Sequence, residues 1–275
     1  MNHFDIEFAA VTDIGKIREK NEDNVLISSE LSLGVVADGM GGHSAGEIAS
    51  SIAVSVLAET IRKINSGTLN IPDTFLPKLA PTERKLLMAA NLANAAIYST
   101  AQSSPVYKMM GTTLTGVLFD KDTATAVHVG DSRIYLCRDK KIVQITTDHS
   151  LAMEHVRRGL ISKADADKSK IQNVLTRAMG IKKNIEFDLL RFPVRAGDVL
   201  VLCSDGLYKG LTERAIEEIV EKGRNWPIVK LCKQLVRVSN EHDGQDNISA
   251  AVIKILPPKK LSFVQKIRRF FSRKK

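Results

Sequence analysis

The sequence lacks long apolar runs and is poor in aromatic residues, and each shortage excludes a class of protein. No apolar stretch approaches the ~18 residues that indicate a membrane-spanning helix. Aromatic residues make up only 5% of the chain. A nucleic-acid surface usually interleaves basic and aromatic side chains, so we expect no nucleic acid as a partner. The first ten residues, MNHFDIEFAA, include acidic residues and no apolar core, so a secretory signal is not expected either.

Cysteine is also scarce. Cys137, Cys203 and Cys232 are far apart in the sequence and form no C-x-x-C pair. This spacing indicates neither a disulfide framework nor a zinc knuckle. We therefore expect a cytoplasmic protein, and we expect it to be a monomer.

The positive charge is concentrated at the end of the chain. The formal net charge is +9, and much of the excess lies in residues 257–275. Pro257 and Pro258 cannot continue a central strand, which predicts a folded domain over residues 1–256 and a basic tail after it. At ~100° per residue the tail's apolar side chains share one face of a helix. Such a tail fits an anionic membrane surface, here the inner leaflet, or a partner's groove. The alternatives are that it packs back on the domain or is disordered.

Hydrophobic periodicity predicts an α+β protein. Apolar residues at helical spacing predict four helices, over residues 44–64, 82–101, 212–222 and 227–240. Short β-type runs predict strands over residues 4–11, 24–28, 33–37, 112–119, 123–129, 133–138, 142–145, 185–193, 199–203 and 248–255. The short links at 120–122 and 139–141 favour antiparallel hairpins. Helices grouped between antiparallel strands favour α+β layers over a βαβ fold.

Carboxylates recur where apolar strands end. Asp38 ends LGVVAD, Asp131 ends AVHVGD, Asp205 ends VLVLCSD, and Asp246 opens the last strand. A single Asp-Gly pair is most often a turn residue that bonds its own backbone. Several such carboxylates converging on one site would instead form an oxygen-rich cage, which suits Mg²⁺ or Mn²⁺.

Eight segments carry a resemblance to a known family. They are DIGKIREKNED, VVADGMGGHSAGE, GTT, GDSRIY, TTDHS, VLTRAMG, LCSDGL and GQDNIS. In this order, from about residue 8 to residue 255, the sequence resembles the metal-dependent protein phosphatases of type 2C in their bacterial form. The resemblance implies a fold of two antiparallel β-sheets sandwiched between pairs of helices. It also implies a serine/threonine protein phosphatase that acts on phosphoproteins, the targets of serine/threonine kinases in bacterial signalling.

The resemblance implies a role for each site residue. Asp38 would bridge two Mn²⁺ or Mg²⁺ ions, with the Gly39 carbonyl on one of them. Asp205 and Asp246 would complete the first ion, and Glu22 would hold the second mostly through water. The remaining roles are a weaker third ion at Asp131 together with Asp205, substrate phosphate at Arg18, and orientation of the ligands by Asp23.

The implied reaction is attack on phosphorus by a water that two cations activate. Met40 stands where eukaryotic members have a histidine, so the proton donor is open between His43 and water. His43 can equally be a polar residue at a helix start. Residues 151–170 match the family's variable flap, whose polar, glycine-interrupted sequence favours a mobile loop.

Two other functions are compatible with parts of this pattern. A catalytically silent phosphatase-like binding module should have lost a metal carboxylate, whereas the core ones are all present. A two-metal nuclease or nucleotidase would use the same carboxylate chemistry but would not explain the order of the motifs.

Overall fold

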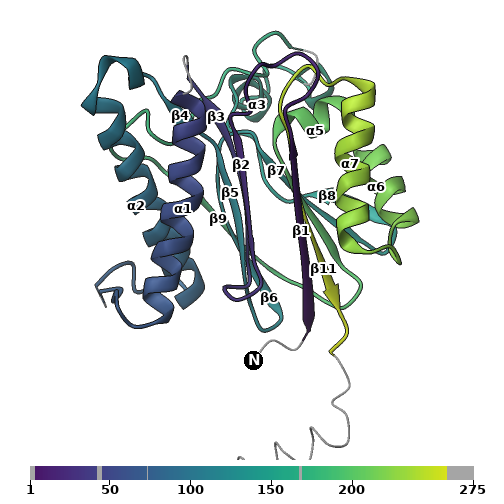
Figure 1. The fold of residues 1–275 in the computed structure, drawn as a ribbon, viewed down its shortest axis with the longest axis horizontal. Coiled ribbons are helices and arrows are strands. Elements are labelled where there is room, and N and C mark those ends of the chain that lie inside the picture. Colours follow the sequence, from purple (N-terminus) through teal and green to yellow (C-terminus); the bar gives the residue numbers. More distant parts are fainter. Residues whose placement is uncertain (1–3, 42–44, 73, 167–168, 259–275) are drawn as a thin grey trace, which may run out of the picture.

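Two antiparallel sheets face each other, and a pair of helices covers the outer face of each (Figure 1). The computed structural model describes residues 4–41, 45–72, 74–166 and 169–258. This arrangement confirms the predicted α+β sandwich. The tail from residue 259 onward and His43 lie outside the described residues, and so do the predictions made for them.

The first sheet joins the two ends of the domain. Its strand order is β1-β11-β10-β7-β8. The strands are β1 (Asp5–Asp13), β7 (Arg133–Arg138), β8 (Lys141–Gln144), β10 (Val199–Cys203) and β11 (Ile248–Leu256). β1 pairs antiparallel with β11 from Asp5 opposite Leu256 to Asp13 opposite Ile248. Strands from near the start and near the end of the sequence are therefore neighbours at one edge of this sheet.

The second sheet has the strand order β2-β3-β5-β6-β9, and β4 pairs with β3 at one end. The strands are β2 (Asp23–Ser28), β3 (Leu33–Met40), β4 (Gly111–Thr112), β5 (Leu114–Asp120), β6 (Thr123–Val129) and β9 (Asp188–Pro193). The predicted hairpins β5–β6 and β7–β8 are antiparallel, as expected. β9 begins three residues later than predicted.

Three apolar layers hold the sandwich together, which explains the near-continuous apolar strands. In β3, Val35 and Ala37 face the helices on one side, whereas Val36 faces the other sheet. In β10, Leu200 and Leu202 face between the sheets, and their neighbours pack under the helices of the other side. Successive side chains of a strand point to opposite faces, so a strand covered on both faces must be apolar throughout.

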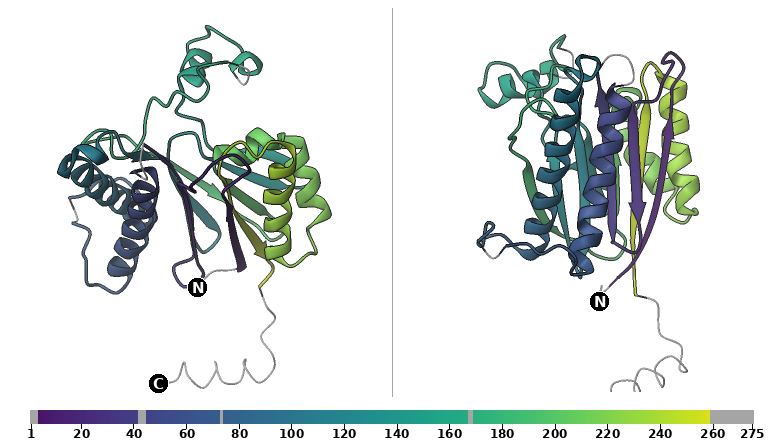
Figure 2. Two further views of the ribbon diagram at one scale, coloured as in Figure 1. Left: turned by 45° about the horizontal axis from the view of Figure 1, so that its top comes forward. Right: turned by 60° about the vertical axis from the view of Figure 1, so that its left-hand side comes forward.

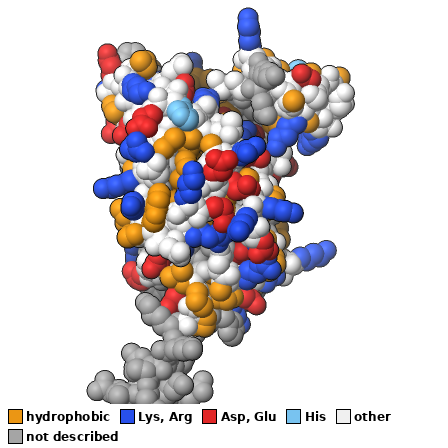
Figure 3. All heavy atoms as spheres, turned by 90° about the vertical axis from the view of Figure 1, so that its right-hand side faces the viewer, with side chains coloured by type: hydrophobic (Ala, Val, Ile, Leu, Met, Phe, Trp, Pro, Cys, Tyr) orange, Lys and Arg blue, Asp and Glu red, His pale blue; other side chains and the backbone are white. Residues whose placement is uncertain are grey.

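The helices follow the predicted ranges closely. α1 (Ala45–Asn65) and α2 (Pro81–Ser103) cover the second sheet, and α6 (Glu213–Lys222) and α7 (Ile228–His242) cover the first. The outer face on the α6 and α7 side carries acidic and basic side chains next to one another (Figure 3), including the pairs Arg214–Glu218 and Arg237–Glu241. Of the helices in the described part of the chain, none has the length and apolar character needed to span a bilayer.

The segment predicted as a mobile flap contains two short helices. Ser150 caps the start of α3 (Leu151–Arg157), where its hydroxyl accepts a hydrogen bond from the Met153 amide, and α4 (Lys163–Ala166) follows. The left view of Figure 2 shows this segment standing out from one end of the two sheets.

Candidate metal centre

The strand-end carboxylates meet in a cleft of about 530 Å³. All the predicted ligands line it, and so does the predicted phosphate-binding arginine: Arg18, Glu22, Asp38, Gly39, Asp131, Asp205 and Asp246. Both sheets contribute, because Asp38 lies on β3 whereas Asp205 follows β10 and Asp246 precedes β11. The cleft is therefore assembled across the sandwich, at one end of both sheets.

Asp38 is fixed by the strand that follows α2. The prediction ended this strand at Ala37, but β3 continues to Met40 because Gly39 and Met40 pair with β4. The Asp38 amide donates to the Thr113 hydroxyl at 2.9 Å, and the Asp38 carbonyl accepts from the Thr113 amide at 2.9 Å. The GTT motif thus clamps the backbone of Asp38.

Gly39 lies where no side chain fits. A Cβ at this position would be 2.2 Å from the Gly46 carbonyl oxygen at the start of α1 and 2.5 Å from the Glu22 carbonyl oxygen. The Gly39 amide donates to that Glu22 carbonyl at 3.1 Å. Glycine therefore lets β3, α1 and the Glu22 loop approach one another closely, and this contact brings Glu22 to the cleft.

Glu22 is held from two sides. Its carboxylate accepts a backbone hydrogen bond from Gly46 in the first turn of α1, where a helix N-terminus favours negative charge. Its own amide donates to the Asn247 side chain at 2.8 Å. The Asn247 amide group also donates to the carbonyls of Ile14 and Lys20. Asn247 had no predicted role, yet it ties the loop that carries Arg18 and Glu22 to the start of β11.

Two basic side chains of the protein itself engage the ligands. Arg18 Nη2 lies 2.9 Å from Asp246 Oδ1, and the Arg18 side chain is 52% exposed. The Lys209 ammonium forms an ion pair with Asp205 and lies 3.8 Å from Asp246 Oδ2. Lys209, on the short helix α5 (Asp205–Gly210), was not singled out in the sequence.

Asp23 lies behind the cleft and does not line it. It is opposite Asp38 in the β2–β3 register and is buried. Its carboxylate accepts a 2.7 Å hydrogen bond from the Ser204 hydroxyl, which also accepts from the Ser249 amide. Asp23 therefore links both sheets directly beneath the carboxylate cluster.

Burial and mutual repulsion raise the pKa of the clustered carboxyls. Burial is the main cause for Asp38, whose pKa lies well above the ordinary value, and the neighbouring carboxylates add to it. Burial likewise raises the pKa of Asp23 and of Asp131 to about 7. Burial raises the pKa of Asp205 as well, although the Lys209 ammonium opposes this. Carboxylates this close together repel one another when ionised, so a cation between them would stabilise their charged forms.

The donors fit hard divalent cations. Carboxylates converge beside Gly39, and the described lining residues include no Cys or His, so this set suits Mg²⁺ or Mn²⁺ rather than a softer metal. In the described ranges, no three Asp, Glu, His or Cys side chains already form a group that could hold an ion. Asp246 and Asp205 form ion pairs with Arg18 and Lys209 instead.

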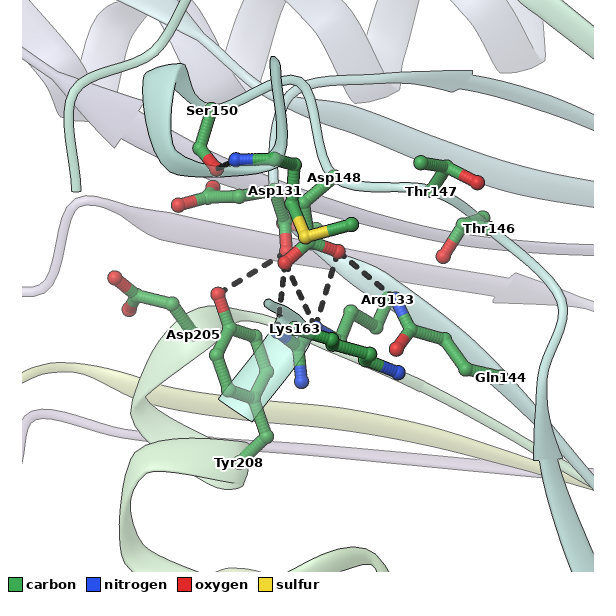
Figure 4. A network of polar contacts seen from close by, with 12 residues as sticks. Asp131, Arg133, Gln144, Thr146, Thr147, Asp148, Ser150, Lys163, Asp205 and Tyr208 are labelled. Atoms are coloured by element: carbon green, nitrogen blue, oxygen red, sulfur yellow. Dashed lines mark hydrogen bonds and ion pairs between the residues drawn. The ribbon is translucent and has the colours of Figure 1, made fainter. Parts of the chain in front are cut away.

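A second polar network supports the cleft from behind (Figure 4). Arg133 donates to both carboxylate oxygens of Asp148 at 2.6–3.0 Å, and its guanidinium stacks on the Tyr208 ring at 3.6 Å. The Tyr208 hydroxyl donates to the Asp131 carbonyl at 3.2 Å. The GDSRIY and TTDHS motifs are thus joined to α5, and the network positions the backbones of both Asp131 and Lys209.

The raised pKa values predict how pH affects the stability of metal-free protein. Between pH ~4, near which unfolded Asp loses its proton, and pH 7, folded Asp131 keeps a proton that the unfolded chain has lost. Its contribution to the free energy of unfolding therefore falls as pH rises through this window. In chelator, the difference in melting temperature between wild type and Asp131→Asn should shift in favour of the variant from pH 5 to pH 7.5, by several degrees at ~2–4 °C per ~1 kcal/mol.

The matched control is Asp122→Asn, a change at an exposed carboxylate on the β5–β6 link. Its melting temperature should follow that of the wild type at every pH. If the difference in melting temperature between wild type and Asp131→Asn does not change with pH, the prediction is wrong.

Comparisons with known proteins agree with this fold. Residues 18–252 match the family model described as Protein phosphatase 2C. The serine/threonine phosphatase stp of Listeria welshimeri is 34% identical over 245 residues, which cover 88% of this chain and 93% of that protein. The solved structure of Stp1 from Staphylococcus aureus has a TM-score of 0.80 at 29% identity and covers 92% of this chain and 96% of that chain.

A further solved structure contains metal. The catalytic domain of the serine/threonine protein phosphatase PstP, in complex with two manganese ions, matches with a TM-score of 0.76 at 32% identity. The match covers 91% of this chain and 98% of that chain.

Proposed function

Because this chain belongs to the protein phosphatase 2C family of metal-dependent serine/threonine phosphatases, we propose that its cleft removes phosphate from phosphoserine and phosphothreonine in proteins. It would thereby oppose serine/threonine kinases in bacterial signalling. The observation that carries this proposal is the convergence of Glu22, Asp38, Asp131, Asp205 and Asp246 with Arg18 in one cleft.

Two Mn²⁺ or Mg²⁺ ions would occupy the cleft. Asp38 would contact both, with the Gly39 carbonyl on one of them. Asp205 and Asp246 would complete the first ion, and Glu22 would hold the second mostly through water. Once bound, such ions lower the pKa of a coordinated water and offset charge on phosphoryl oxygens. A third, weaker ion at Asp131 and Asp205 belongs to the same expectation.

The remaining site residues would bind the substrate and orient the ligands. Arg18 is exposed enough to reach a phosphate and lies at the rim of the cleft beside Asp246. Its planar guanidinium can hold two phosphate oxygens at once. Asp23 would orient its neighbours through Ser204. No thiol takes part, because Cys137, Cys203 and Cys232 are buried and burial raises the pKa of each to about 12.

Domain organisation and location extend the proposal. Residues 1–256 would form the catalytic domain, which acts as a cytoplasmic monomer on phosphoprotein substrates and not on nucleic acid. The tail, residues 257–275, would bring this domain to the anionic inner surface of the membrane or to a partner.

One assay separates the proposal from its alternatives. Purified protein is given a phosphothreonine peptide, a nucleotide and a DNA substrate, each with Mn²⁺ and each with chelator. A protein phosphatase hydrolyses the peptide with Mn²⁺ but not with chelator, and it leaves DNA intact. Preference for the nucleotide or for DNA would indicate a nucleotidase or nuclease, and no turnover of any substrate would indicate a silent binding module.

A further inference from the structure

A smaller cavity of about 280 Å³ opens beside the carboxylate cleft. We call it the side pocket, and its apolar lining residues are Met40, Leu175, Ala178, Ile181 and Ile185. The carboxylate cleft shares three of them, Met40, Leu175 and Ile181. Met40 directly follows the predicted ligands Asp38 and Gly39 in the sequence. The side pocket is therefore continuous with the proposed metal centre and is not a separate hollow on the surface.

The turn that carries Ile181 is fixed to α2. Asn94, which is buried on α2, accepts a hydrogen bond of 2.9 Å from the Gly180 amide. The Asn94 side chain also donates to the carbonyls of Lys182 and Lys183 at 3.1 and 3.0 Å. One buried side chain thus holds the whole turn in place, whereas the Ile181 side chain that the turn brings to the side pocket remains 36% exposed.

The opposite wall of the side pocket is also held by the protein. Leu175 forms a β-bridge with Ser150, which fixes its backbone. Arg177 donates to the Asp188 carboxylate at 3.0 Å and to the Glu186 carbonyl at 3.3 Å. Because the Arg177 guanidinium already has partners, it is not free to bind a charged group of a ligand. The side pocket is therefore formed in advance and favours an apolar occupant.

We propose that the side pocket binds an apolar side chain of the phosphoprotein substrate, close in sequence to the phosphorylated residue, and thereby selects substrates with a leucine-like residue there. The inference rests on the proposed phosphatase function. The volume of about 280 Å³ suits a single side chain, since pockets for a whole small-molecule ligand have ~300–1,000 Å³. An extended peptide advances only ~3.3–3.6 Å per residue, so a phosphorylated residue at the ions has its near neighbours beside Met40. Covering the exposed apolar wall with such a neighbour removes apolar surface from water.

The test measures kcat/KM with Mn²⁺ on phosphothreonine peptides. All neighbours of the phosphothreonine are alanine except one leucine, which is moved through the three positions on either side. At one position, leucine should raise kcat/KM of the wild type roughly 10-fold or more over the all-alanine peptide, as apolar groups in a hydrophobic pocket do. Ile181→Ser should bring this leucine-to-alanine ratio close to one. Val143→Ser is the matched control and should keep the ratio, because Val143 is 56% exposed on β8 and lines neither cavity.

The outcomes separate this inference from the proposed function. If leucine gives no advantage at any position, or if the advantage persists in folded Ile181→Ser, the inference is wrong although the protein is still a phosphatase. If Ile181→Ser raises turnover of all the peptides alike, the side pocket holds another segment of this chain or a second copy, and not the substrate. Should Ile181→Ser not fold, Ile181→Ala takes its place and should also lower the ratio. No hydrolysis of any phosphopeptide would contradict the proposed function itself, and the inference with it.

Discussion

Replacing Asp38 by alanine should reduce phosphopeptide turnover on the order of 10³-fold or more, with the protein still folded. Asp38 lies among the carboxylates of the cluster, and Thr113 clamps its backbone. Ions that neutralise phosphoryl charge and activate water supply several kcal/mol of transition-state stabilisation, and each ~1.4 kcal/mol is a factor of ten in rate. Asp205→Ala and complete chelation should cause losses of the same order.

The measurement is the steady-state rate at saturating Mn²⁺, with circular dichroism and melting temperature to verify folding. Asp38→Ala should keep or gain stability in chelator, because it removes a repelling carboxylate, whereas Asp205→Ala also removes the ion pair with Lys209 and needs the folding check most. Asp122→Ala, at an exposed position, serves as the matched control and should retain wild-type turnover. Near-full turnover by Asp38→Ala, by Asp205→Ala or by chelated enzyme would show that the metal ligands are assigned wrongly.

Replacing Arg18 by alanine should raise the KM for phosphopeptide more than it lowers kcat. Arg18 would bind phosphate in the ground state as well as in the transition state, and losing such uniform binding appears in KM. Hydrogen bonds to charged groups contribute roughly 1.5–3 kcal/mol, so kcat/KM should fall by roughly 10- to 150-fold. Because Arg18 also pairs with Asp246, the assay needs saturating Mn²⁺, so that changes in ion affinity do not enter KM.

Two further variants sharpen this experiment. Arg18→Lys keeps the charge but loses the two-pronged geometry, so its KM should lie between those of wild type and Arg18→Ala. Arg237→Ala removes an exposed arginine that pairs with Glu241 on α7 and should leave KM unchanged. If Arg18→Ala has the KM of wild type, Arg18 does not contact the substrate.

The layers and the origin of the cleft carboxylates could be predicted because they depend on local sequence. Strands covered on both faces have short, almost entirely apolar sequences. A charged residue such as Asp38 or Asp205 follows the apolar run of the buried strand. Helix periodicity placed α1 and α7 to within a few residues. These sequence patterns do not depend on which distant segments the strand or helix contacts in the folded protein.

The features of the fold and of the site that the sequence did not predict depend on contacts between segments far apart in the chain. β3 runs past Ala37 because β4 pairs with it, and a glycine-rich stretch alone predicts a turn. Asn247 accepts a hydrogen bond from Glu22, which is 225 residues away in the sequence. A separation of this length matches neither the helical nor the strand period, so the sequence pattern does not predict the contact. Lys209 belongs to the same class, since a lysine one turn after an aspartate on an exposed helix is usually a surface ion pair.

The pairing of β1 with β11 has a consequence for protein synthesis. Asp5–Asp13 is made first and Ile248–Leu256 last, yet these strands are neighbours in the finished sheet. Asp246, which lines the cleft, also emerges late. A growing chain on the ribosome therefore cannot complete the cleft, and products cut short before β11 should be inactive. Phosphatase activity should begin only as synthesis of the domain ends, so the cell gains whole enzymes and no partly active fragments.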